Sequence, residues 1–165
     1  MMSKTLWIFF SVIIIGTLTS CDNECKFEPN LDVNQSQLAE DIEKIDAYLA
    51  ENEIEAEIHP SGIRYVLKRA GDGNKPGNCS QVRVSYEGKL ISDGSVFDDA
   101  TDTIRVFDLQ ALITGWQIGI PIMKDGGRIT LFIPSVYAYG ANGRPNNGIP
   151  ANANLQFEII LYESF

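Results

Sequence analysis

The chain has 165 residues, of which 44% are apolar and 10% aromatic, and its formal net charge is -9. This length holds one domain with a hydrophobic core, plus an appendage. Because nucleic acids and anionic lipid surfaces attract lysine and arginine, the acidic balance argues against both as partners.

The first 20 residues have the composition of an export signal. A positive start at Lys4 precedes an almost wholly apolar run from Thr5 to Leu18, which is shorter than the roughly 20 residues that a membrane-spanning helix needs. Residues 18–21 (LTSC) resemble the bacterial lipobox, in which the cysteine is lipidated. We therefore expect a lipoprotein signal over 1–20, lipidation of Cys21 and a tether over 21–35; the alternative is an uncleaved signal or anchor helix.

Two further cysteines, Cys25 and Cys79, remain for an exported and oxidising setting. A bridge between them would stabilise the fold by roughly 4 kcal/mol in the chain-entropy model; the alternative is two free thiols. A metal site is not expected, because the chain has no Cys-x-x-Cys motif and His59 is its one histidine.

A helical period follows the tether and predicts a helix over about 36–53, within an N-terminal extension over 36–58. Asn34 or Ser36 can cap this helix, and Glu40 and Asp41 are expected to interact with the positive end of its dipole. The apolar stripe has two alternative partners, the helix's own domain or a second copy of the chain, which would give a homodimer. The stripe consists of Leu38, Ile42, Ile45 and Leu49.

From Gly62 onward the pattern changes to the alternation of β-strands. Ile63, Tyr65 and Leu67 are expected on one face of the first strand, with Arg64 and Lys68 on the other. Further strands are expected over 82–87, 96–97, 129–133 and 155–161, with one short helix over about 109–120. Because helix and strand do not alternate regularly, the order favours an α+β fold with a curved antiparallel sheet. The long loop over 139–153 is expected to be functional.

The residues exclude several kinds of covalent chemistry. A catalytic triad needs a histidine beside its nucleophile, and His59 lies before the first strand. Asp98 and Asp99 are neighbours on an extended segment and point to opposite faces, so they cannot flank one bond. No phosphate-binding glycine loop occurs in a strand-to-helix setting. An aromatic pocket that breaks no covalent bond is the remaining interpretation.

Eight pieces of sequence, in order, resemble FKBP-type peptidyl-prolyl isomerases over roughly 62–162. They are Val84-Ser85-Tyr86-Glu87-Gly88, Val96-Phe97-Asp98, Leu112-Ile113-Thr114-Gly115-Trp116, Gly126-Gly127-Arg128, Ile133-Pro134, Tyr137-Ala138-Tyr139-Gly140, Ile149-Pro150 and Leu155-Gln156-Phe157-Glu158. The resemblance implies an FKBP-like domain over 59–165, in which a half-barrel sheet wraps over one short helix.

The resemblance also implies a set of site residues. Those implied to act in catalysis are Tyr139, Asp98, Trp116 and Phe97. Those implied to bind substrate are Tyr86, Phe107, Leu112, Ile113, Ile149 and Phe157. Trp116 would form the pocket floor, while Tyr139 and the backbone N–H of Ile113 would donate to substrate carbonyls. Phe107 and Phe157 have an ordinary core role as the alternative, and Tyr137 is expected to anchor a loop.

The implied function is peptidyl-prolyl cis-trans isomerisation during folding of exported proteins. Amide resonance sets a barrier of about 18–20 kcal/mol, and an apolar pocket that removes water from the amide oxygen favours the twisted form. No cofactor is required. The alternative is a chaperone or binding module with little isomerase activity. Arg105 and the segment 144–148 depart from common family versions, which leaves the preferred residue before proline open.

The implied partners are proline-containing polypeptides and tacrolimus-type macrolides. With the lipid anchor, the expected location is the bacterial cell envelope, at the outer membrane on its periplasmic or surface face rather than at the inner membrane. The residues that follow Cys21 do not decide which membrane carries the protein.

Overall fold

The computed structural model describes residues 26–165. Its helices are α1 (Gln35–Glu51) and α2 (Thr114–Gly119), with short 3-10 turns η1 (Leu109–Ala111), η2 (Ile120–Ile122), η3 (Ser135–Tyr137), η4 (Gly140–Asn142) and η5 (Pro145–Asn147). Its strands are β1 (Glu57–Ile58), β2 (Arg64–Arg69), β3 (Gln81–Leu90), β4 (Val96–Asp99), β5 (Arg105–Asp108), β6 (Arg128–Ile133) and β7 (Leu155–Ser164).

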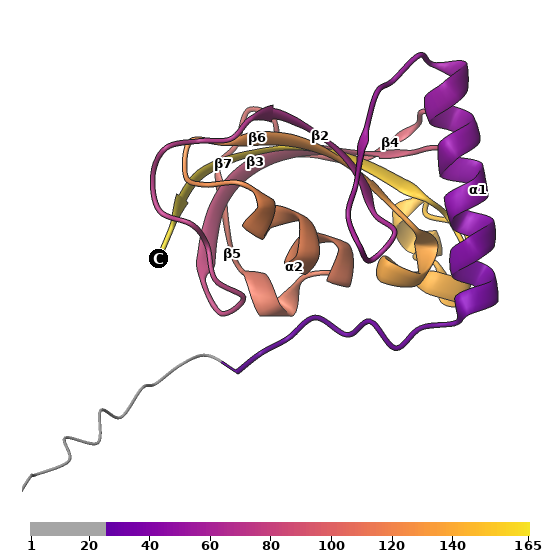
Figure 1. The fold of residues 1–165 in the computed structure, drawn as a ribbon, viewed down its shortest axis with the longest axis horizontal. Coiled ribbons are helices and arrows are strands. Elements are labelled where there is room, and N and C mark those ends of the chain that lie inside the picture. Colours follow the sequence, from indigo (N-terminus) through magenta and orange to yellow (C-terminus); the bar gives the residue numbers. More distant parts are fainter. Residues whose placement is uncertain (1–25) are drawn as a thin grey trace, which may run out of the picture.

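The strands form one antiparallel sheet in the order β1-β2-β6-β7-β3-β4, and β5 also pairs with β3. The two long strands β3 and β7 lie side by side along their whole length. Figure 1 shows this sheet arching over α2, while α1 stands across one end of the arch. The predicted α+β fold, with a curved sheet over a short helix and a preceding helix, is confirmed.

The main core fills the space between the sheet and α2. Alternate residues of β7 are buried, as the period of a strand requires. Helix α2 approaches the sheet closely because its glycines have no side chain, and a Cβ atom on Gly119 would overlap the side chain of Leu131 in β6. The same core contains Trp116 and Phe157.

Helix α1 begins where its cap predicts and packs on its own domain. The side chain of Asn34 accepts hydrogen bonds from the backbone N–H groups of Ser36 and Gln37, at 3.1 and 3.2 Å. The helix ends at Glu51, and Glu53 follows with a left-handed φ of 54°. Ile45 and Leu49 pack with Phe132 of β6 in a second, smaller cluster. The apolar stripe is therefore covered within one copy of the chain.

One expectation about α1 is wrong, and one residue of β2 has a partner that the strand period does not reveal. Neither Glu40 nor Asp41 serves the helix dipole, since the first turn of α1 contains no acidic residue, and Asp41 is fully buried towards the domain. Arg64 is 7% exposed, and its guanidinium makes two 2.8 Å bonds to the carboxylate of Asp46. Asp41 and Arg64 lie where α1 covers the domain, and the strand period alone does not reveal this cover.

Several expectations fall on residues outside the described range, namely the signal over 1–20, the lipidation of Cys21 and the residue Cys25. Cys79 is a disulfide cysteine, and its pairing with Cys25 stays a prediction. Between residues 26 and 165, no helix is long and apolar enough to cross a membrane.

Candidate functional site

Aromatic residues from six parts of the chain gather into one pocket of about 160 Å³. β3, β4, β5, α2 and β7 each contribute one ring, the segment after β6 contributes the sixth, and the segment before α2 closes one side. The lining residues are Tyr86, Phe97, Asp98, Phe107, Leu112, Ile113, Trp116, Tyr139, Arg144 and Phe157. The pocket exists because the arch of the sheet places these distant segments around the start of α2.

The rings stand edge to face around Trp116. The indole is perpendicular (89°) to the rings of Tyr86, at 5.0 Å between centroids, and of Phe157, at 5.2 Å. Phe97 stands at 84° to Phe157, with centroids 5.5 Å apart. Such edge-to-face pairs contribute about 0.5–1.5 kcal/mol each beyond simple burial. The walls are therefore held in a defined shape before any ligand arrives.

Gly88 makes this ring arrangement possible. A Cβ atom at this position of β3 would lie 2.7 Å from the ring of Phe97 and 2.8 Å from that of Phe157. Any side chain there would push the two rings apart, so a glycine is needed for close approach rather than for backbone freedom.

One acidic group lies in the pocket, and it is already engaged. The hydroxyl of Tyr86 donates a 2.8 Å hydrogen bond to the carboxylate of Asp98. Burial, and then this bond, raise the pKa of the Tyr86 hydroxyl well above its ordinary value, while the nearby charge of Arg105 acts in the opposite direction. Tyr86 therefore stays protonated at physiological pH and holds Asp98 at the rim.

Two hydrogen-bond donors at the pocket have no acceptor within residues 26–165. They are the hydroxyl of Tyr139 and the backbone N–H of Ile113, which precedes the first turn of α2. A third unpaired group, the indole N–H of Trp116, is fully buried among the rings. The first two donors can reach carbonyl oxygens of a bound peptide, because they line the pocket rather than lie beneath it.

A family model described as FKBP-type peptidyl-prolyl cis-trans isomerase matches residues 73–162. The chain belongs to this family. The matched range contains every residue that lines the aromatic pocket, so the resemblance seen in the sequence is confirmed at the level of the family.

Individual relatives agree with the family. The chain is 38% identical over 123 residues to a probable FKBP-type isomerase FkpA of Neisseria meningitidis, covering 72% of this chain and 44% of the relative. It is 39% identical over 105 residues to FkpA of Escherichia coli, covering 62% and 38%. The chain therefore spans less than half the length of these curated relatives.

Solved structures give the same answer for the fold. The crystal structure of FkpA from Escherichia coli superimposes with a TM-score of 0.67 at 31% identity, covering 79% of this chain and 63% of that one. A peptidyl-prolyl cis-trans isomerase from Pseudomonas syringae superimposes with a TM-score of 0.65 at 30% identity, covering 79% and 94%. The solved structures thus support an FKBP fold for this chain, which also contains α1.

The structure brings together all but one of the FKBP site residues expected from the sequence. Ile149 is the exception, because it is 2% exposed and belongs to the core rather than to the pocket lining. Its backbone instead pairs with that of Arg144 across a tight loop. Tyr137 is 3% exposed and donates to the carbonyl of Ser61 at 3.1 Å, which agrees with a loop-anchoring role.

Arg144 is a lining residue that sequence reasoning did not place in the site. Its guanidinium carbon lies 5.5 Å from the centroid of the Tyr139 ring, a cation–π distance. The departure of segment 144–148 from common FKBP versions was the available signal, but a loop without a period gives no direction for a side chain. The lining of the pocket therefore includes a cation over the ring of Tyr139.

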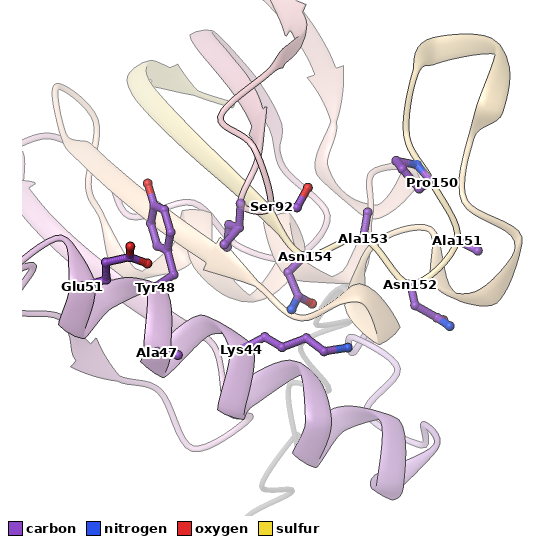
Figure 2. A pocket seen from close by; sticks show the side chains of 11 residues that line it. Lys44, Ala47, Tyr48, Glu51, Ser92, Pro150, Ala151, Asn152, Ala153 and Asn154 are labelled. Atoms are coloured by element: carbon purple, nitrogen blue, oxygen red, sulfur yellow. The ribbon is translucent and has the colours of Figure 1, made fainter.

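A larger groove of about 490 Å³ lies elsewhere, between α1 and the loop before β7. Figure 2 shows Lys44, Tyr48 and Glu51 of α1 on one side and residues 150–154 on the other. The Tyr48 hydroxyl already donates to Gln156 at 3.2 Å. Tyr48 is the one aromatic residue in the lining of this groove, so we assign the functional site to the aromatic FKBP pocket, although that pocket is smaller.

Proposed function

We propose that this protein is a peptidyl-prolyl cis-trans isomerase that acts on proline-containing polypeptides. The observation that carries the proposal is the aromatic pocket of about 160 Å³, with its engaged carboxylate and two unpaired donors. The family membership and the likeness to FkpA proteins support it.

The mechanism follows from the polarity of the site. Resonance in the X-Pro amide places negative charge on its oxygen, and water stabilises this planar form. In a pocket of aromatic rings the oxygen loses that water, so the planar ground state loses more stabilisation than the twisted transition state. Catalysis arises from this difference, since binding both states equally well would not raise the rate of the chemical step.

Each part of the pocket has a proposed role in that difference. Trp116 supports the proline ring from below, and Phe97 and Phe157 enclose it. Tyr139 and the N–H of Ile113 donate to the carbonyls that flank the twisting bond and hold the substrate across the pocket. Asp98 keeps the Tyr86 hydroxyl in place through their 2.8 Å bond and takes no part in proton transfer.

The decisive experiment follows isomerisation of a short proline peptide with and without tacrolimus. The wild type is expected to accelerate isomerisation, and tacrolimus is expected to abolish the acceleration by filling the pocket. Tyr139→Phe removes one donor and is expected to lower kcat/KM by about three- to ten-fold, the value of one hydrogen bond. Tyr162→Phe is the matched control, because the Tyr162 hydroxyl bonds to Ser85 and does not line the pocket.

A second candidate function is a chaperone that holds extended chains with little turnover. The observation in its favour is exposed apolar surface on the two strands that carry Phe97 and Phe107. Val96 is 50% and Val106 is 52% exposed there. A wild type that suppresses aggregation of a denatured protein, but does not accelerate isomerisation above background, would replace the enzyme proposal with this one.

The cell-envelope location and the lipid anchor at Cys21 are part of the proposal, with a signal over 1–20 and a tether over 21–35. Their support is the apolar run and the lipobox-like residues 18–21. Replacing Cys21→Ser in the producing bacterium is expected to move the protein from the membrane to the soluble fraction. An unchanged membrane fraction would argue for an anchor helix.

Two further features stay proposals with simple tests. A Cys25–Cys79 bridge predicts a linked peptide pair in a non-reducing digest that separates on reduction. A homodimer through α1 would have to use a face of the helix other than its apolar stripe, because Ile45 and Leu49 pack against Phe132 of the same copy. Sedimentation at micromolar concentration distinguishes a dimer from a monomer.

A further inference from the structure

A fully buried carboxylate connects α1 to the segment that carries Tyr139. Asp41 has 0% exposure, and one of its carboxylate oxygens accepts a 2.6 Å hydrogen bond from the hydroxyl of Ser135. The same oxygen lies 3.4 Å from the backbone N–H of Val136. The other oxygen accepts a 3.0 Å bond from Gln37, on the preceding turn of α1. The carboxylate is thus directed at the start of one loop segment.

Asn154 joins the other end of that segment to the same point. Its side-chain oxygen accepts the backbone N–H of Ser135 at 3.0 Å, and its amide donates to the backbone carbonyl of Asp41 at 3.2 Å. Ser135 is 0% exposed and Asn154 is 8% exposed. Residues 135 and 154 are therefore brought together, and both are held by one residue of α1.

The segment closed in this way forms one side of the pocket. Both Tyr139 and Arg144 line the aromatic pocket from within it. Its backbone is further closed by a 2.9 Å bond from Asn152 N–H to the carbonyl of Gly140. Ser135 and Val136 lie in the 3-10 turn just before Tyr139, so only a short, hydrogen-bonded stretch of backbone separates the partners of Asp41 from Tyr139.

Stability alone is a poor reason for this arrangement. No ion pair to Asp41 occurs among the described residues, and burying a carboxyl group is costly even when it is hydrogen-bonded. An aliphatic residue at this position of α1, with an apolar residue at position 135, would pack against the domain without that cost. The hydrogen bonds of the Asp41 carboxylate are directional, so they form together in only one placement of residues 135 and 136.

We infer that Asp41, with Asn154, is a positioning residue of the active site, which sets the placement of Tyr139 from the N-terminal helix. This inference rests on the proposed isomerase function. It makes α1 part of the catalytic apparatus, although α1 contributes no residue to the pocket lining.

Asp46 supplies a matched control on the same helix. Its carboxylate also attaches α1 to the domain, through the two 2.8 Å bonds to Arg64, but its side chain is 50% exposed and its partner lies in β2. Asp46→Ala therefore weakens the attachment of α1 without touching the segment between Ser135 and Asn154.

The test measures kcat/KM for a proline peptide together with the free energy of unfolding for each variant of the full chain. Asp41→Ala is expected to lower kcat/KM by about ten-fold, as a small misplacement of a substrate-holding group does. Asp46→Ala is expected to lower stability while leaving kcat/KM within about two-fold of the wild type. Equal losses of kcat/KM in the two variants would overturn the inference.

Combining Asp41→Ala with Tyr139→Phe distinguishes a positioning role of Asp41 from a purely structural one. If Asp41 acts through Tyr139, the loss caused by Asp41→Ala should shrink to about two-fold in the Tyr139→Phe background, because the hydroxyl to be positioned is already gone. The same ten-fold loss in both backgrounds would contradict the inference.

Two further measurements keep the test decisive. Ser135→Ala removes the 2.6 Å bond alone and serves if Asp41→Ala does not fold; it is expected to lower kcat/KM by about three-fold. Amide hydrogen exchange over residues 138–149 should speed up in Asp41→Ala or Ser135→Ala, but not in Asp46→Ala. An inactive wild type would refute the isomerase proposal, whereas unchanged exchange over this segment would refute the positioning role.

Discussion

The aromatic pocket and the polar base of the Tyr139 segment are built on opposite principles. The pocket consists of rings whose contacts are apolar and depend on shape, as in the perpendicular packing of Trp116 on Tyr86 and Phe157. The base consists of directional bonds among the buried groups of Asp41, Ser135 and Asn154. One region removes water from a ligand, and the other determines where a donor stands.

The difference predicts how each region responds to change. Apolar packing tolerates a substitution that keeps volume, since the lost energy follows the lost contacts. A buried hydrogen-bonded group tolerates little, because its partner stays buried and becomes unsatisfied. Four predictions test this contrast, in decreasing order of expected effect.

The largest effect is expected at the pocket floor. Trp116→Ala should lower the free energy of unfolding by about 3–5 kcal/mol, because it leaves a large cavity beneath the rings. Trp116→Phe should cost only about 1 kcal/mol, since it keeps a ring and removes the unpaired buried indole N–H. Denaturant unfolding followed by circular dichroism measures both values. Equal losses would show that the pocket is not tolerant of ring-for-ring change.

The polar base should be sensitive to the loss of a hydrogen bond even where little volume is removed. Asn154→Ala removes little volume but leaves the buried N–H of Ser135 without its acceptor and removes the additional hydrogen bond to the Asp41 carbonyl, and we expect a loss of about 2 kcal/mol. Asn142→Ala, an exposed change in the same loop, is the control and should alter stability by less than about 0.5 kcal/mol. Comparable small losses in the two variants would remove the contrast between the regions.

A smaller effect concerns the charge at the pocket rim. Arg144 lies over the Tyr139 ring and makes no ion pair within the described part of the chain. Peptides with glutamate before proline should therefore be turned over about two- to three-fold faster than those with glutamine, the scale of an exposed charge contact. Arg144→Gln should abolish this ratio, and added salt should reduce it in the wild type. A ratio that survives the substitution would assign the preference elsewhere.

The smallest effect is a pH dependence at the turn that supports Tyr137. Burial lowers the pKa of His59, whose ring nitrogen accepts the N–H of Ser61 at 3.2 Å. The folded state thus favours the neutral ring, so this contribution to stability is present above pH 6.5 and is lost as the pH falls through the lowered value. Unfolding at pH 7.5 and 5.5 should show a larger decrease for the wild type than for His59→Gln. Identical decreases would exclude a contribution from His59.

The sequence by itself determined the period of α1, the alternation of the strands and the aromatic residues of the pocket, because these depend on local spacing and residue type. It offered Asn34 and Ser36 as alternative caps, and the cap is Asn34; a cap can be predicted locally because it bonds within its own turn. It also ordered the FKBP motifs, and the arch of the sheet brought the expected site residues, except Ile149, to one place.

Only the tertiary structure decided which polar residues of α1 and β2 are buried. The local pattern relates Asp41 to the helix dipole and gives Arg64 only a strand face, whereas both side chains are buried because α1 lies across the end of the sheet. The partners of Asp41 lie 94 and 113 positions away along the chain. Bonds over such separations leave no period in the sequence, since each depends on two elements meeting in one orientation.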